Sequence, residues 1–252
     1  MPIYLAWRSV YFNYPALQAV RTPKPKTNPL TVICQSSRSY FKHSVIGASL
    51  AYCCLYFTVL SDAHPLTTAY LKVAGVSNAL LAVARGGGAL AGILGTLLFP
   101  VLHSRYGMIC ANMFAAWAFV LCIVPISLLF IKNFIGDALL RAYCMLGAIV
   151  LSRAFLWCFD LANVFLMQIS VQESMRGELN AAQGALCQLM QLLISALALF
   201  YASNFSVLVF SSAGGVSAAA ISLSIWACMR KDAPMPESRA ISLVNDDSEE
   251  VA

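Results

Sequence analysis

The sequence predicts an all-α membrane protein with six transmembrane helices. Of its 252 residues, 60% are hydrophobic and only 11% are charged, an apolar share well above that of soluble domains. The mean hydropathy is +0.75, and long apolar stretches are separated by short polar connectors. A soluble chain of this length could not bury so much apolar surface. Each stretch must therefore cross the bilayer as a helix, because lipid offers the backbone no hydrogen-bonding partners.

Six apolar stretches reach the roughly 20 residues that a helix needs to cross the hydrocarbon core. The first and the fourth are longer than a straight crossing requires, so we expect them to be tilted, broken or kinked. We expect the six crossings at residues 45–71, 79–102, 108–131, 142–171, 181–203 and 205–229. Together they form one transmembrane lobe at 44–229, between a basic cytoplasmic segment at 1–43 and an acidic, disordered cytoplasmic tail at 230–252.

The first stretch contains the polar sequence Ser61-Asp62-Ala63-His64-Pro65 near its middle. Pro65 removes a backbone hydrogen bond and clashes with the carbonyl four residues earlier, so we expect the helix to open and leave carbonyls near Ser61 free. Helices broken near the midplane bind ions in many transporters. Asp62 and His64 supply a carboxylate and an imidazole, which suit a divalent transition metal. Alternatively, both lie at the outer water interface after a shorter span.

The second stretch combines Arg85 with a cluster of glycines. Gly88 and Gly92 are four residues apart, a spacing that lets another helix approach closely. We favour packing over phosphate binding, because no strand precedes the glycines and no Lys-Ser/Thr pair follows them. Arg85 requires a carboxylate or carbonyl groups nearby. The third stretch carries no Asp, Glu, Lys or Arg.

The fourth stretch carries Arg153, Trp157 and Asp160 on one helical face. Arg153 and Asp160 are two turns apart, about 10 Å along the helix axis, which is too far for a direct ion pair. We therefore expect each of them to find a partner on another helix. Gating contacts and structural ion pairs are both open interpretations.

The fifth stretch follows a polar loop at 172–178 and carries Gln188 and Gln191, three residues apart. One face of this helix is therefore polar, and such a face usually borders the interior of a bundle. The sixth stretch carries no Asp, Glu, Lys or Arg.

The basic residues are distributed asymmetrically around the six crossings. If the N-terminus faces the cytoplasm, the inner segments hold eleven lysine and arginine residues and the outer loops hold three. This bias places both termini in the cytoplasm. The net charge of +5 then reflects membrane topology, and we expect no nucleic-acid partner. The acid-free N-terminal segment could be an organellar transit peptide, but we favour a cytoplasmic loop and hence the plasma membrane.

The remaining polar residues give no indication of an enzyme. The nine cysteines include no CxxC pair, and eight of them lie in apolar runs, where cysteine packs as a small hydrophobic residue. We therefore expect neither a disulfide framework nor a thiolate metal cluster. The three histidines form no HExxH motif, and no serine triad is apparent. We expect no cofactor.

The chain is similar to the C-terminal half of the ferroportin family of iron exporters (solute carrier family 40). The strongest matches are RxxLWxFDL at 153–161 and ESxRGxxNxxQ at 173–183. Further matches are SYF at 39–41, LYFTVL at 55–60, TT at 67–68, GILGT at 92–96 and RYG at 105–107. The resemblance covers roughly residues 39–229.

The resemblance implies a major-facilitator fold with two six-helix lobes, of which this chain would be the second, C-terminal lobe. It implies export of divalent iron together with an N-terminal lobe that this chain lacks. His64 or Pro65 falls at the family's metal-binding cysteine, which hepcidin contacts in vertebrates, so no vertebrate-type hepcidin contact is implied. Gln191 and Ile194 replace an acid and a metal-binding histidine, and Arg176-Gly177 matches the cytoplasmic gate. The alternatives are a half that cannot transport, or a carrier for another metal or an organic solute.

Overall fold

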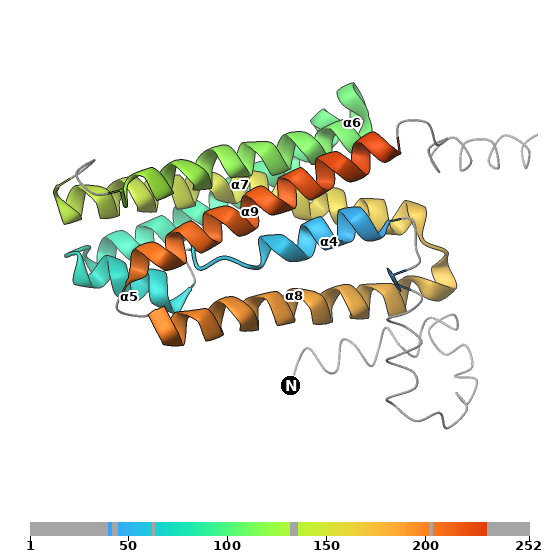
Figure 1. Ribbon diagram of the computed structural model, residues 1–252. Helices are drawn as coiled ribbons and strands as arrows, with labels where there is room; N and C mark the ends of the chain where they lie inside the picture. The colour runs from blue at the N-terminus through green and yellow to red at the C-terminus, as the bar shows by residue number, and fades with distance from the viewer. Residues whose placement is uncertain (1–39, 42–44, 62–63, 132–135, 202–203, 231–252) are drawn as a thin grey trace, which may run out of the picture.

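The computed structural model describes residues 40–41, 45–61, 64–131, 136–201 and 204–230. Within these ranges the chain is entirely helical apart from its connections, and α6, α7, α8 and α9 are long and apolar enough to cross a membrane. The predicted all-α membrane fold is thus confirmed. In chain order the helices are α4 (Ile46–Leu55), α5 (Pro65–Val73), α6 (Asn78–Leu128), α7 (Ala138–Ser170), α8 (Glu173–Tyr201) and α9 (Phe205–Met229) (Figure 1).

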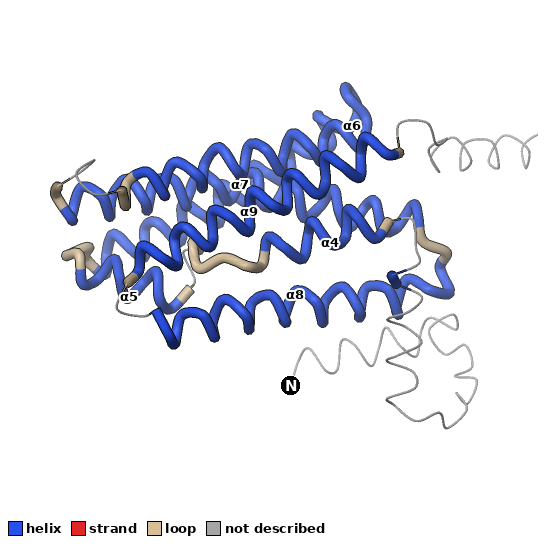
Figure 2. Tube along the Cα trace, viewed as in Figure 1, coloured by secondary structure: helices blue, strands red, loops and turns tan. Residues whose placement is uncertain are grey.

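The first predicted crossing is broken into α4 and α5, with a non-helical segment between them (Figure 2). The segment begins at Tyr56, earlier than the opening that we expected near Ser61. Pro65 does not distort a continuous helix but starts α5, because its missing N–H is not needed in a first turn. His64 caps α5, since its Nδ1 accepts a hydrogen bond from the Leu66 N–H over 3.3 Å.

Other parts of the lobe satisfy the backbone of the break. The Val59 N–H donates to the Ser212 hydroxyl of α9 over 3.0 Å, and the Val59 carbonyl accepts from the Thr67 hydroxyl of α5. The Ser61 carbonyl accepts from the His64 N–H over 3.2 Å. The Val59 and Ser61 carbonyls are therefore not free, contrary to the expectation from Pro65, because an unpaired carbonyl inside a membrane protein is costly.

The second and third crossings are the two arms of α6. A helix of 51 residues would be about 76 Å long, more than twice the thickness of the hydrocarbon core. Gly107 interrupts it with φ 75° and ψ 172°, a conformation that favours glycine. The chain reverses there, so the arms 78–106 and 108–128 run in opposite directions (Figure 1). They correspond to the predicted crossings at 79–102 and 108–131.

Glycines let the first arm of α6 approach α7 closely, as their spacing predicts. A Cβ atom on Gly95 would overlap the backbone carbonyl oxygen of Ala154, and one on Gly92 would lie 2.9 Å from the Trp157 indole ring. Gly88, one turn earlier, is also buried. Here the two backbones touch without intervening side chains, which is the packing that small residues allow in membranes.

The last two helices lie on opposite sides of α4 (Figure 1). The bounds of α9 agree with the predicted crossing at 205–229. In contrast, α8 begins at Glu173, so most of the loop predicted at 172–178 is the first turns of this helix. Only 17% of the apolar window of α8 is buried, against 39% to 44% in the three other long helices. Helix α8 is thus the least buried of the four long helices.

Candidate functional site

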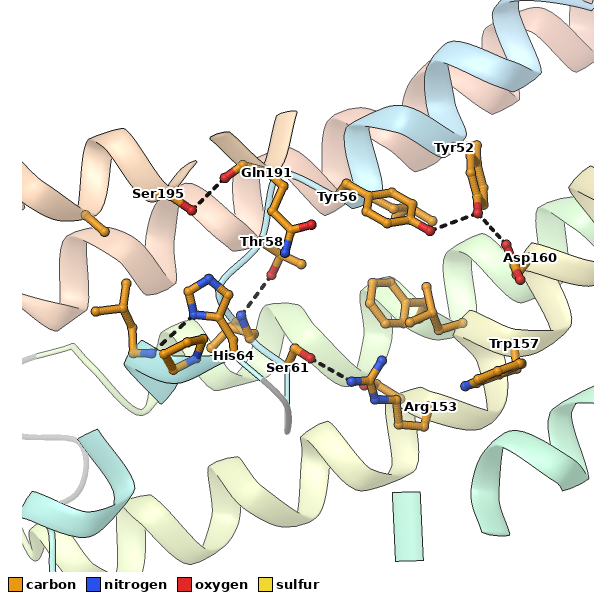
Figure 3. A pocket seen from close by; sticks show the side chains of 18 of the residues that line it. Tyr52, Tyr56, Thr58, Ser61, His64, Arg153, Trp157, Asp160, Gln191 and Ser195 are labelled. Atoms are coloured by element: carbon orange, nitrogen blue, oxygen red, sulfur yellow. Dashed lines mark hydrogen bonds between the residues drawn. The ribbon is translucent and has the colours of Figure 1, made fainter. Parts of the chain in front are cut away.

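A cavity of about 790 Å³ lies against the break between α4 and α5. Its lining comes from both of these helices, the break, α6, α7 and α8, and Figure 3 shows how the polar side chains face it. Its apolar walls include Leu55, Leu60, Phe119 and Leu156. Five of the residues that the sequence singled out line this cavity: His64, Arg153, Trp157, Asp160 and Gln191.

Asp160 is the acidic group of the cavity. The Tyr52 hydroxyl of α4 donates a hydrogen bond to Asp160 Oδ1, and the Tyr52 and Tyr56 hydroxyl oxygens are 2.9 Å apart (Figure 3). The expectation that Asp160 finds its partner on another helix is confirmed. The sequence did not single out the two tyrosines, which lie one helical turn apart, because a phenol in an apolar stretch is common. They bring two more oxygen atoms to the carboxylate.

Arg153 is the basic group of the cavity and lies two turns before Asp160 on α7. Its guanidinium donates a hydrogen bond to the Ser61 hydroxyl over 2.6 Å (Figure 3). This bond connects α7 to the break, as we expected of a cation that cannot reach Asp160. Trp157, which lies between the two charges along the helix, is 48% exposed. The cavity thus has one positive and one negative end on the same helical face.

The His64 imidazole faces the cavity while it caps α5 (Figure 3). An Nδ1 that accepts a hydrogen bond leaves the proton of the neutral ring on Nε2. A metal bound at Nε2 would require the proton on Nδ1 and would therefore remove the cap. Capping and metal binding through Nε2 are thus alternative states of His64. Asp62, the other predicted ligand, lies outside the described residues.

Helix α8 contributes an amide and a hydroxyl. Gln191 lines the cavity, and the Ser195 hydroxyl donates to the Gln191 backbone carbonyl over 2.7 Å. Ile194, by contrast, is completely buried and does not line the cavity. The part of α8 that the resemblance associates with a metal therefore presents only neutral oxygen and nitrogen donors.

Three predicted cavity or gating residues lie elsewhere. Arg85 donates to the Thr68 hydroxyl over 3.3 Å at an exposed position on α6. Arg176 donates from Nε to the Val171 carbonyl over 2.9 Å and so braces the connection between α7 and α8. A Cβ atom on Gly177, the next residue, would have nothing within 4 Å. None of these three residues lines the cavity, because each lies on a part of its helix that is outside the cavity wall.

The arrangement is suited to transient cation binding. A carboxylate, two phenols, an amide and an imidazole face one space, but no group of three or more His, Cys, Asp or Glu side chains is placed to hold a metal within the described ranges. A site with few charged ligands binds an ion weakly and releases it readily, as conduction and transport require.

Comparisons with known proteins agree on one family. Residues 24–216 match the family model described as Ferroportin1. The chain is 34% identical over 156 residues to "Solute carrier family 40 member 1" of Oryza sativa subsp. japonica, covering 61% of this chain and 31% of that protein. It is 28% identical over 214 residues to the Arabidopsis thaliana protein of the same name, covering 81% of this chain and 40% of that protein. The chain thus spans less than half the length of these relatives.

Solved structures show the same similarity. A bacterial homologue of the iron transporter ferroportin in an outward-facing state matches with a TM-score of 0.72 and 25% identity, covering 90% of this chain and 54% of that chain. The outward-facing structure with soaked iron matches with a TM-score of 0.69 and 27% identity, covering 75% of this chain and 47% of that chain.

Proposed function

The chain belongs to the ferroportin family, and we propose that it forms the second lobe of a transporter that exports divalent iron. Its six crossings have the all-helical fold of the family's transporters, which is of the major-facilitator type. The observation that carries the proposal is the cavity at the broken first crossing, which combines His64 and Asp160 with neutral oxygen donors. Such a donor set suits a divalent first-row metal. Iron would be the transported substrate, and Asp62 would supply a second carboxylate.

We further propose that an N-terminal lobe completes the pathway. This chain spans 54% of the bacterial homologue that it matches, and Arg176-Gly177, which matches the family's cytoplasmic gate, lies outside the cavity of this lobe. A contact with the matching part of an N-terminal lobe would allow Arg176-Gly177 to act as a cytoplasmic gate. The distribution of basic residues favours a cytoplasmic position for both termini, and the plasma membrane is the favoured location. A vertebrate-type hepcidin contact is not part of the proposal, because no cysteine stands at 64 or 65.

The dimensions of the cavity support a second candidate, an organic solute carrier. A space of about 790 Å³ is far larger than one ion needs, and Trp157, Tyr52 and Tyr56 line it. Pockets of this size with aromatic walls bind drug-sized molecules. Binding measurements with metal ions distinguish the two candidates.

Iron efflux tests the proposed division into lobes. Vesicles that contain the 252-residue chain alone should not release divalent iron above background, whereas vesicles that also contain the N-terminal half of the Oryza sativa relative should. The N-terminal half alone is the control. Efflux from this chain alone at the rate of a full-length relative would contradict the need for a second lobe. The two lobes can also be cross-linked to each other to ensure that they are paired. If such vesicles still release no iron, the result would favour the alternative that this chain is a half that cannot transport.

Replacing His64 tests the metal site in the cavity. In His64→Asn the side-chain oxygen can still cap α5, but the imidazole ligand is lost. Calorimetric titration with cobalt should show an affinity about tenfold or more below that of the wild type, a loss of about 1.4 kcal/mol or more. His103→Ala removes an imidazole that does not line the cavity and should leave the affinity unchanged. Equal affinity in wild type and His64→Asn would exclude His64 as a ligand and favour the organic solute.

A further inference from the structure

Cys53 and Cys187 bring two thiols together inside the lobe. Cys53 lies on α4 and Cys187 on α8, 134 residues apart in the sequence, and their sulfur atoms are 3.5 Å apart. Both are buried, with 1% and 4% of their surface exposed. Cys187 donates its S–H to the Cys53 sulfur, and Cys53 donates its S–H to the Gln183 carbonyl oxygen over 3.6 Å. We propose that this pair is a site of reversible oxidation, at which a disulfide locks α4 to α8 beside the cavity.

The surroundings of the two thiols are polar for a buried position. The buried hydroxyls of Tyr40 and Ser49 are 2.6 Å apart, and Ser49 lies one helical turn before Cys53 on α4. The Cys187 S–H donates to the Cys53 sulfur, and such a donor stabilises a thiolate, which is the reactive form of cysteine.

Hydrogen peroxide is a sufficient oxidant. The Cys53 thiolate attacks one oxygen of peroxide, which breaks the O–O bond and gives a sulfenic acid, while the departing hydroxide takes a proton and becomes water. The Cys187 sulfur then attacks the Cys53 sulfur, and the sulfenic oxygen leaves as a second water. Two thiols thus lose two protons and two electrons, and one peroxide becomes two waters. The sulfurs must approach by about 1.5 Å to reach the disulfide length of about 2.05 Å.

The bond would join the helices at the level of the cavity. Tyr52, which donates to Asp160, precedes Cys53, and Gln191 lies one turn after Cys187 on α8. Both of these neighbours line the cavity, so the thiols lie close to its wall. Helix α8 is also the least buried of the four long helices, with 17% of its apolar window buried. A covalent connection therefore constrains α8 more than it would constrain α7 or α9.

Peroxide treatment of the purified full chain tests the proposal. After oxidation, unreacted thiols are alkylated and the protein is analysed by mass spectrometry and by thermal unfolding. We expect a peptide pair joined through Cys53 and Cys187 that dithiothreitol separates, together with a higher unfolding temperature. Cys187→Ser and Cys187→Ala should show neither effect. Cys54→Ser removes the neighbouring thiol of α4, which is only half-buried, and should keep both effects.

Two outcomes would overturn the proposal. In the first, Cys53 and Cys187 are still alkylated after a treatment that oxidises the exposed thiols of Cys110, Cys144 and Cys228. In the second, Cys53 is oxidised singly or is joined to another cysteine. Neither readout depends on metal binding, so the result is separate from the outcome for the proposed transport.

Discussion

The Gly95→Ala variant is expected to be less stable than the wild type by about 1–3 kcal/mol, the range for overpacking a well-packed interior. The added Cβ would overlap the carbonyl oxygen of Ala154 on α7. That oxygen belongs to the backbone of a long helix, so it cannot move aside as the end of a side chain could. Relief requires α6 and α7 to separate, and these two helices form the most extensive contact of the lobe.

The matched control for this variant is Gly86→Ala. Gly86 lies on the same arm of α6, and a Cβ there would have nothing within 4 Å. Because alanine favours a helix by up to about 1 kcal/mol over glycine, this variant should be as stable as the wild type or slightly more stable. Thermal and denaturant unfolding in detergent would measure both. Equal stability of Gly95→Ala and Gly86→Ala would show that α6 and α7 leave room for a methyl group at Gly95.

The two charges of the cavity should affect cation binding in opposite directions. Asp160→Asn removes a negative charge and should weaken cobalt binding, whereas Arg153→Gln removes a positive charge and should strengthen it. A divalent cation roughly 10 Å from a unit charge interacts by about 3 kcal/mol at an effective dielectric constant of about 20. Screening by water and salt reduces this value, so we expect changes of about tenfold or more in the dissociation constant.

Ser61→Ala is the control for the Arg153 variant. It removes the acceptor of the 2.6 Å hydrogen bond from Arg153 but keeps the positive charge of Arg153. The variant therefore distinguishes the effect of losing this hydrogen bond from the effect of losing the charge. Calorimetric titrations with cobalt at two salt concentrations would measure all three variants. If Asp160→Asn and Arg153→Gln change the affinity in the same direction, disturbance of the cavity, and not its electrostatics, controls binding.

Hydropathy predicted where the crossings lie along the chain, because each one must present about 20 apolar residues to lipid, but not that α8 begins as early as Glu173. The bounds of α9 agree with the prediction, and the reversal at Gly107 separates the second and third crossings where a polar connector was expected. The break in the first crossing was predicted from Pro65, but its start at Tyr56 was not. That start depends on Ser212 of α9, which lies far away in the sequence and bonds the Val59 N–H.

Only some of the residues that line the cavity could be predicted from the sequence. Arg153 and Asp160 are conspicuous because ionisable side chains are rare inside crossings, and both line the cavity. Tyr52 is not conspicuous, since its role depends on the packing of α4 beside α7. The same limit applies to Cys53 and Cys187, which only the contact between α4 and α8 brings together.

The hydrogen bonds around the break have a kinetic consequence. Because side chains of Ser212 and Thr67 hold Val59 in its non-helical conformation, the unwound segment needs no ion to form, which bears on the transport that we propose. An ion that enters need not melt a helical turn, and one that leaves need not wait for a turn to form again. Such preorganisation removes an ordering step from binding. Occupancy of the cavity should then follow the ion concentration rapidly, and the slow step of a transport cycle would lie in the movement of whole helices.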